Sequence, residues 1–182
     1  LNGFADSALL ADIQGKIAAH GVRVGYHAAD LTKPAEIAAM MEYAEQDFAG
    51  VDILINNAGM QFVAPIQEFP TEKWDMIIAL NLSAAFHTTR LAIPQMQRKG
   101  WGRIINIASV HGLVASVNKS AYVAAKHGIV GLTKAVALEL AETPITCNAI
   151  CPGWVLTPLI QKQIDNVAKR DGVDNATAQH IL

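Results

Sequence analysis

Two kinds of apolar pattern alternate along the chain. Short, nearly continuous apolar runs are typical of strands buried on both faces of a parallel sheet. Longer stretches with apolar residues three or four apart indicate amphipathic helices. Strands separated by helices of this length predict an α/β fold with a doubly wound parallel sheet and right-handed crossovers. The predicted strands are 23–28, 51–56, 103–109 and 145–150, and the predicted helices are 34–48, 71–99 with room for a break, 120–142 and 158–169.

The two ends of the pattern differ from a complete fold of this kind. A dinucleotide-binding sheet usually opens with a strand, a Gly-rich turn and a helix, and no spaced-glycine turn precedes Gly25. The chain opens like the tail of a second strand and ends at Leu182 within an apparent helix. We therefore expect a single incomplete domain over 1–182. It would lack the first strand with its Gly-rich turn and the C-terminal strand, and the polypeptide would continue at both ends.

Composition narrows the class of protein. Of the 182 residues, 52% are hydrophobic and 16% are charged, which indicates a globular rather than a disordered chain. A net charge of −2 gives no basic field for nucleic acid or an anionic membrane. The longest continuous apolar runs are far shorter than a membrane span, and residues 1–4 have no basic region of a signal peptide. Cys147 and Cys151 lie four apart on one strand face, so we expect buried thiols and a reducing cytoplasm.

A tyrosine and a lysine lie four positions apart, at Tyr122 and Lys126, in the helix predicted from Ser120. This spacing places both side chains on one helix face. A phenol, with a reference pKa of about 10, exchanges protons poorly at neutral pH, and a nearby ammonium favours the phenolate. Tyr122 is therefore a candidate general acid/base for an alcohol–carbonyl interconversion. The spacing also occurs by chance, with an exposed lysine beside a half-buried tyrosine, so the context decides.

Small and polar residues near strand ends supply that context. Ser109 ends a predicted strand before Tyr122, at the edge where parallel sheets place ligands, and its hydroxyl can donate to a carbonyl oxygen as charge develops there. The Asn-Asn-Ala-Gly run at 56–59 allows close approach of the backbone to a ligand. Asn81 lies within a predicted helix, where asparagine is a poor helix former. Taken singly, these residues also fit a strand cap, an ordinary turn and a helix kink.

As a set, in this order and spacing, these residues resemble the short-chain dehydrogenase/reductase family over essentially the whole chain. The resemblance implies a Rossmann-like fold and a nicotinamide cofactor, whose hydride chemistry needs no metal. It implies that Ser109 holds the substrate oxygen and that Tyr122 transfers the proton. Lys126 would favour the phenolate of Tyr122 and bind the nicotinamide ribose, and Asn81 would help to hold a water that relays protons to Lys126.

The same resemblance implies which residues contact the cofactor. Asp30 and Leu31 match the pair that contacts adenine, and the turn after 145–150 matches the residues that flank the nicotinamide amide. A cationic residue after the second strand would favour NADP. Residues 1–6 contain none, so we expect NAD. The expected cofactor-binding residues are Asp30, Leu31, Asn57, Ala58, Gly59, Tyr122, Lys126, Pro152, Gly153, Val155 and Thr157.

Within the family, residues 69–75, 107–115, 118–122 and 150–154 are similar to the bacterial D-3-hydroxybutyrate dehydrogenases. The resemblance implies oxidation of (R)-3-hydroxybutyrate by NAD to acetoacetate and NADH. Lys119, one helical turn before Tyr122, suits a small anionic substrate. The expected substrate-binding residues are Gln61, Ser109, His111, Lys119, Tyr122, Trp154 and Gln163.

Two alternatives stay open at this point. One is an NADPH-dependent reductase of 3-oxoacyl thioesters, which would not need a cluster of carboxylate-binding side chains. The other is an inactive fragment, because the phosphate-binding turn is not found in these residues. Taken singly, Lys119 also fits a solvated lysine at the start of a helix. The resemblance further implies a homotetramer with the helices near 82–96 and 121–140 at an interface, and no nucleic-acid or membrane partner.

Overall fold

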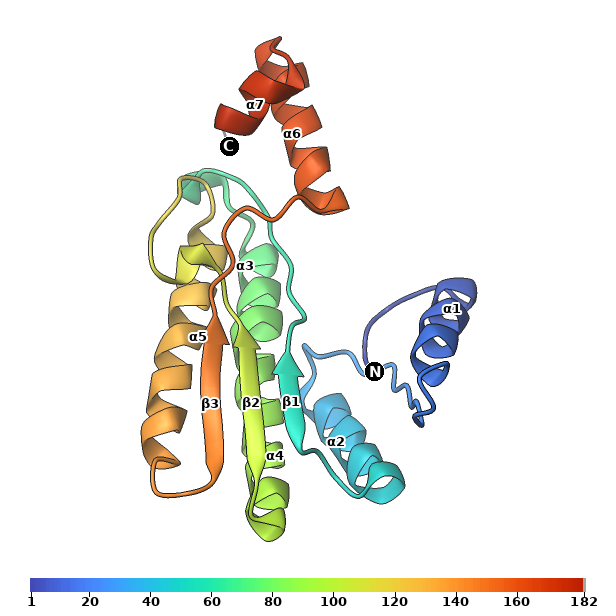
Figure 1. The fold of residues 1–182 in the computed structure, drawn as a ribbon. Helices are drawn as coiled ribbons and strands as arrows, with labels where there is room; N and C mark the ends of the chain where they lie inside the picture. The colour runs from blue at the N-terminus through green and yellow to red at the C-terminus, as the bar shows by residue number, and fades with distance from the viewer. Residues whose placement is uncertain (182) are drawn as a thin grey trace. The chain divides into compact units, whose positions relative to one another are not determined.

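The computed structural model describes residues 1–181, which fall into two compact units, Leu1–Cys151 and the residues from Pro152 onward. The first unit contains a sheet of three parallel strands in the order β1-β2-β3 (Figure 1). The strands are β1 (Ile53–Asn56), β2 (Gly102–Ile107) and β3 (Ile145–Ile150). The predicted parallel α/β fold of the Rossmann type is confirmed.

The helices follow the predicted pattern closely. The long stretch after Thr71 carries the break for which the sequence left room, since a π-helical turn separates two α-helices there. The helices are α1 (Ser7–Ala18), α2 (Pro34–Phe48), α3 (Thr71–Ile78), α4 (Ala84–Lys99), α5 (Ser120–Glu139), α6 (Pro158–Asp171) and α7 (Asn175–Ile181), with short helical turns η1 (Ile66–Glu68), η2 (Ala79–Ser83) and η3 (Val110–Gly112).

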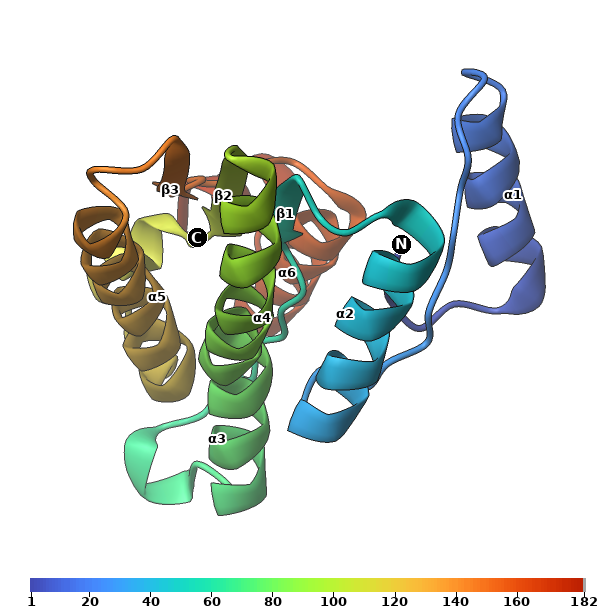
Figure 2. The ribbon, with the colours of Figure 1, turned by 90° about the horizontal axis from the view of Figure 1, so that it is seen from below.

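Helices α4 and α5 cover one face of the sheet, as Figures 1 and 2 show. Successive right-handed crossovers between neighbouring strands place both connecting helices on the same side. On the other face, Ile53, Ile55 and Ile150 are each more than half exposed. The expectation that these strands are covered on both faces is therefore wrong for the described residues, because the described chain winds in one direction from β1 to β3.

The core lies between the sheet, α4 and α2. Ile37 of α2, Met96 of α4 and Ile104 of β2 are fully buried in one cluster. Gly102 lies against this cluster, and a Cβ atom there would lie 2.4 Å from Sδ of Met96. Both cysteines are free thiols, as expected. Cys147 is buried, and burial raises its pKa to about 11. Cys151 is only partly buried, which corrects the expectation of two buried thiols, because it lies beyond the end of β3.

By length and composition alone, the helical stretch Thr71–Lys99 could cross a membrane. This corrects the expectation that no apolar stretch of the chain is as long as a membrane span. The expectation considered continuous apolar runs, whereas the helix also includes polar residues between its apolar ones. Core helices of soluble proteins satisfy the same criterion. In this structure the stretch buries Ala84, Ala92 and Met96 in the core beside the sheet, so we assign it as a core helix.

The first thirty residues depart furthest from the predicted elements. Residues 23–28 are extended but form no strand. The ammonium of Leu1 donates to the carbonyl of Gly25, and the carbonyl of Leu1 accepts from the amide of His27. The side chain of Asn2 donates to the carbonyl of His27, so no ladder of backbone pairs forms here. Helix α1 was not predicted, although Asp6 caps it by accepting a hydrogen bond from the backbone of Leu9. No residue of α1 is buried, so core packing leaves little apolar signal there.

Candidate active site

The predicted tyrosine–lysine pair lies in the first two turns of α5. Nζ of Lys126 is 5.6 Å from the ring centroid of Tyr122, so the two side chains share one face as expected. Lys126 is only 4% exposed, and burial lowers its pKa to about 8, with an opposing contribution from Cys151. An ammonium held in a poorly solvated place beside a phenol is the arrangement that favours the phenolate.

A backbone carbonyl of β2 holds the lysine. Nζ of Lys126 donates a hydrogen bond of 2.7 Å to the carbonyl of Ile107. The amide of Arg103 donates to Asp52, so alternate residues from Arg103 to Ile107 turn their backbone groups toward β1. Strand β1 ends at Asn56, which is paired with Asn106. The carbonyl of Ile107 therefore lies beyond the last pair between β1 and β2 and is available to a side chain.

The predicted serine and histidine lie beside the tyrosine. Oγ of buried Ser109 accepts a hydrogen bond of 3.2 Å from the backbone amide of His111 and caps η3. The ring of His111 meets the ring of Tyr122 nearly at right angles, with centroids 6.2 Å apart. Burial, and then the charge of Lys119, lowers the pKa of His111. Ser109, His111, Lys119 and Tyr122 thus form one cluster at the carboxyl end of β2.

Lys119 is not the solvated lysine that its place at the start of a helix allows. It occupies the N-cap position of α5 and is only 9% exposed. Burial lowers its pKa. The loop before it is held by a hydrogen bond of 3.0 Å from the amide of Ala64 to the carbonyl of Asn118, which has a left-handed backbone with φ of 60°. The fold thus keeps a cation in a poorly solvated place near Tyr122.

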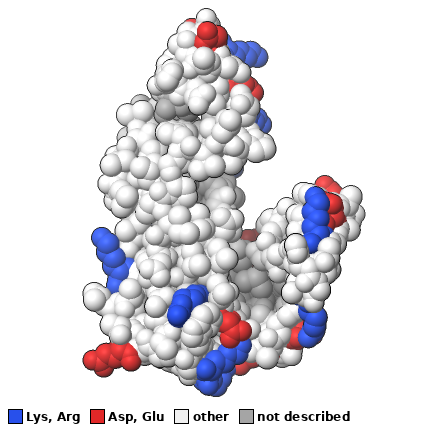
Figure 3. Space-filling model, in the orientation of Figure 1, with Lys and Arg blue, Asp and Glu red and all other residues white. Residues whose placement is uncertain are grey.

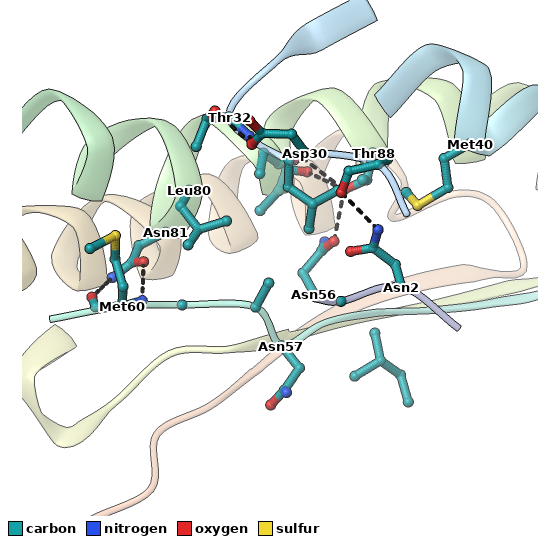
Figure 4. Close-up of a pocket in the computed structure, with 18 of the residues that line it drawn as sticks. Asn2, Asp30, Thr32, Met40, Asn56, Asn57, Met60, Leu80, Asn81 and Thr88 are labelled. Atoms are coloured by element: carbon teal, nitrogen blue, oxygen red, sulfur yellow. Dashed lines mark hydrogen bonds between the residues drawn. The ribbon is translucent and has the colours of Figure 1, made fainter. Parts of the chain in front are cut away.

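Asn81 ties a loop to the long helix. Its Oδ1 accepts from the amide of Met60 at 2.9 Å, and its Nδ2 donates to the carbonyl of Met60 at 2.8 Å (Figure 4). Asn81 lies in the π-helical turn η2 and is buried. Such turns are frequent at functional sites. Both ends of the amide hold the loop that follows Gly59, and a role in a proton relay stays a prediction.

Five of the seven expected cofactor residues of the first unit line one cavity of about 780 Å³ (Figure 4), namely Asp30, Leu31, Asn57, Ala58 and Gly59. The other two, Tyr122 and Lys126, are not among the residues that line this cavity. The carboxylate of Asp30 accepts hydrogen bonds from the hydroxyl and amide of Thr32, which lower its pKa. The structure thus brings together residues that the sequence separates by almost thirty positions.

The other predicted residues are Gln61 of the first unit and six residues of the second unit. Gln61 is half-buried and follows the loop residue Met60. In the second unit, Thr157 caps α6, because its hydroxyl accepts a hydrogen bond from the amide of Ile160. A contribution to the site stays a prediction for Pro152, Gly153, Trp154, Val155, Thr157 and Gln163.

Charged side chains do not gather into one patch on the face that Figure 3 shows. Lys and Arg lie next to Asp and Glu on this face. Ion pairs such as Lys16–Asp12 and Lys99–Asp52 join charges of opposite sign. The face shown therefore offers no broad field of one sign to steer a ligand. Selection of a charged ligand would depend on individual buried cations such as Lys119.

Close packing behind the site gives a testable consequence. A Cβ atom on Gly112 would lie 2.6 Å from the backbone carbonyl of Lys126. We expect Gly112→Ala to lower the free energy of unfolding by about 1–3 kcal/mol, because backbone must move. Gly131→Ala, in an open position of the same α5, should raise it by about 0.5–1 kcal/mol. Chemical denaturation of both variants checks this, and equal stability would contradict the packing.

Three backbone hydrogen bonds of the site had no sequence signal. The carbonyl of Ile107 and the amide and carbonyl of Met60 act through groups that every residue type carries. A polar residue could have been noticed, since Asn106 interrupts the apolar run of β2. Its side chain is buried below the site.

Comparisons with known proteins identify the family of this chain. A sequence profile described as short chain dehydrogenase matches residues 5–168. The D-beta-hydroxybutyrate dehydrogenase of Cupriavidus necator is 64% identical over 100% of this chain and 70% of that protein. A protein of the same name from Rhizobium meliloti is 59% identical over 95% of this chain and 67% of that protein.

Solved structures agree as well. A variant of actinorhodin polyketide ketoreductase with NADPH superposes with a TM-score of 0.87 at 34% identity, over 97% of this chain and 68% of that one. The chain therefore spans about two thirds of the length of these relatives. With its parallel sheet, its paired tyrosine and lysine and these matches, the chain belongs to the short-chain dehydrogenase family.

Proposed function

We propose that this protein interconverts (R)-3-hydroxybutyrate and acetoacetate with NAD. The observation that carries the proposal is the pair of buried lysines around Tyr122. Lys126 lies beside its ring, and Lys119 lies one helical turn earlier. The first suits proton exchange at a phenol, and the second suits a substrate with a carboxylate near the reacting carbon.

The cavity of the first unit fits a nicotinamide dinucleotide. Its volume of about 780 Å³ lies within the range of roughly 300–1,000 Å³ that is usual for small-molecule and cofactor sites. Asp30 and Leu31 would hold the adenine end, and Asn57–Gly59 would approach the cofactor closely because Ala58 and Gly59 are small. When bound, the nicotinamide accepts the hydride from the substrate carbon.

The remaining steps of the proposed reaction are assigned to residues of the cluster. Ser109 donates a hydrogen bond to the substrate oxygen and fixes its position. Tyr122 takes the hydroxyl proton as a phenolate during oxidation and returns it as a phenol during reduction. Lys126, held by the carbonyl of Ile107, stabilises the phenolate and would contact the nicotinamide ribose. Asn81 keeps the loop at Met60 in place and would help to hold a relay water.

Residues around Tyr122 would bind the carboxylate of the substrate. Lys119 would pair with it, and His111 and Gln61 would add hydrogen bonds. Trp154 and Gln163 of the second unit would contact the rest of the substrate. The names of the two bacterial relatives, both D-beta-hydroxybutyrate dehydrogenase, support this choice of substrate.

A reductase of 3-oxoacyl thioesters with NADPH is the second candidate. The structural likeness to a polyketide ketoreductase solved with NADPH favours it. A thioester carries no carboxylate for the buried cation of Lys119, whereas 3-hydroxybutyrate does. The hydroxy acid is therefore the better match to these side chains.

We expect kcat/KM to be at least about tenfold higher with NAD than with NADP. No lysine or arginine lines the cavity in the described part of the chain. The 2′-phosphate would thus lack a charge-assisted hydrogen bond worth about 1.5–3 kcal/mol. Steady-state kinetics with both cofactors, on acetoacetate and on an acetoacetyl thioester, checks this. A preference for NADPH and the thioester would establish the second candidate, and no turnover of either would indicate an inactive chain.

The assembly and the location are also proposed. A homotetramer would use the helices over 82–96 and 121–140, on which Phe86 and Leu138 are exposed large apolar residues. Such side chains are frequent where subunits meet. A cytoplasmic enzyme would keep both thiols reduced.

A further inference from the structure

A chain of polar side chains, three of them buried and one half-buried, crosses the fold beneath the site. The hydroxyl of Thr88 on α4 donates to Oδ1 of Asn56 at the end of β1, at 2.7 Å. Nδ2 of Asn56 donates to Oδ1 of Asn106 on β2, at 2.8 Å. Nδ2 of Asn106 donates to Oγ1 of Thr133 on α5, at 2.9 Å. The chain thus joins both helices and two strands by side-chain hydrogen bonds.

Asn106 is the central member of this chain. It is almost completely buried in an otherwise apolar strand, and burial of an amide is unfavourable unless its hydrogen bonds are made. Both ends of its amide are used, one toward β1 and the other toward α5. A leucine of similar size would suit the apolar strand, so the amide is placed there for its contacts.

The contacts of Asn106 act on the neighbouring residue of β2. Ile107 follows it directly, and the carbonyl of Ile107 accepts the hydrogen bond from Lys126. Thr133 lies two helical turns after Lys126 on α5, so the two side chains face the same strand. One strand and one helix are therefore joined at two adjacent points, first by Asn106 and Thr133, and then by Ile107 and Lys126.

We propose that Asn106 is a positioning residue, which by its hydrogen bond to Thr133 holds the carbonyl of Ile107 against the ammonium of Lys126. The proposal rests on the proposed function, since it gives the amide a task in the proton exchange of Tyr122. The carbonyl stabilises the charged lysine in a buried place. Without it, the ammonium loses its acceptor and the phenolate loses its cation.

Other groups around Lys126 cannot replace the carbonyl. The phenol ring of Tyr122 lies at 5.6 Å on the same helix, and the thiol of Cys151 follows β3. Lys119 and His111 lie near Tyr122, and the charge of Lys119 acts on His111. The hydrogen bond that Lys126 donates to the carbonyl of Ile107 is therefore the contact that favours the ammonium most directly.

The test is a pH titration of Lys126 in the full chain without substrate, monitored by NMR of labelled lysine side chains. The variant Lys126→Arg assigns the signal. In Asn106→Leu and in Thr133→Val, we expect the midpoint for Lys126 to fall by roughly one pH unit or more, because a charge-assisted hydrogen bond is weakened. Thr133→Ser keeps the hydroxyl and should restore the midpoint. In the same variants the pH profile of kcat should also move. For each pH unit by which the midpoint of Lys126 falls, kcat should decrease about tenfold.

A neighbouring threonine gives the matched control. Thr89 is buried on α4, and its hydroxyl has no hydrogen-bond partner among the described residues. Thr89→Val should leave the midpoint of Lys126 unchanged. Unchanged midpoints in both Asn106→Leu and Thr133→Val, with cooperative thermal unfolding retained, would overturn the proposal. If Asn106→Leu does not fold, Thr133→Val and Thr133→Ser decide alone. An inactive wild-type protein would refute the proposed function, while the titration would still test the positioning.

Discussion

We expect Tyr122→Phe to lower kcat for oxidation of 3-hydroxybutyrate by at least about 10²-fold, the range of general acid/base catalysis. Phenylalanine keeps the ring and its contacts with His111 and Lys126. It removes only the oxygen that exchanges the proton. Steady-state kinetics at several pH values measures the loss, and NADH binding, followed by fluorescence, should be retained because the ring still fills its place.

A second tyrosine provides the control for this result. Tyr43 on α2 is half-buried and lies among His27 and Phe48, outside the cluster around Ser109. Tyr43→Phe removes the same hydroxyl group and should change kcat by no more than a few fold. Activity of Tyr122→Phe within a few fold of wild type would refute the assignment of the general acid/base.

The second large effect concerns Lys119. A charge-assisted hydrogen bond contributes roughly 1.5–3 kcal/mol. Lys119→Ala should therefore lower kcat/KM for 3-hydroxybutyrate by roughly 10- to 100-fold. It should hardly affect an uncharged ketone of similar size, if the enzyme accepts one. Burial lowers the pKa of Lys119, so its side chain loses its charge at a lower pH than the usual lysine value of about 10.4. Binding of the anionic substrate should therefore weaken as the pH rises, beginning below that value.

Lys134 allows a matched comparison on the same helix. It is exposed on α5, so Lys134→Ala removes a lysine without removing a buried cation. Kinetics on both substrates should then match wild type. Equal losses of Lys119→Ala on the acid and on the ketone would mean that Lys119 supports the helix or Tyr122. No loss on either would favour the thioester reductase.

The sequence predicted the elements best where burial and periodicity agree. Strand β3 and helix α2 have the predicted bounds, because each has an apolar pattern and clear ends. Helix α1 was missed because it has no buried face, and residues 23–28 lack the neighbours that make a strand. Coverage of the sheet depends on the direction in which the chain winds, which no local pattern encodes.

The site divides in the same way. Tyr122, Lys126 and Ser109 could be found because their side chains carry a recognisable chemistry at a fixed spacing. The distances between these side chains could not be predicted, because they depend on where β2 ends beside α5. The burial of Lys119 was also invisible, because a lysine at a helix start is usually solvated. The roles of the backbone at Met60 and Ile107 arise from geometry alone.

The π-helical turn at Ala79–Ser83 has a consequence for how related genes should be compared. A π turn holds one residue more than an α-helical turn between the same two ends. Loss of a single codon here would restore a regular helix between the same two ends. The core face of α4 would keep its orientation, whereas Asn81 would lose the position from which its amide reaches Met60. A one-residue gap within these five positions therefore fits the same fold of α4, but it removes the contact at Met60.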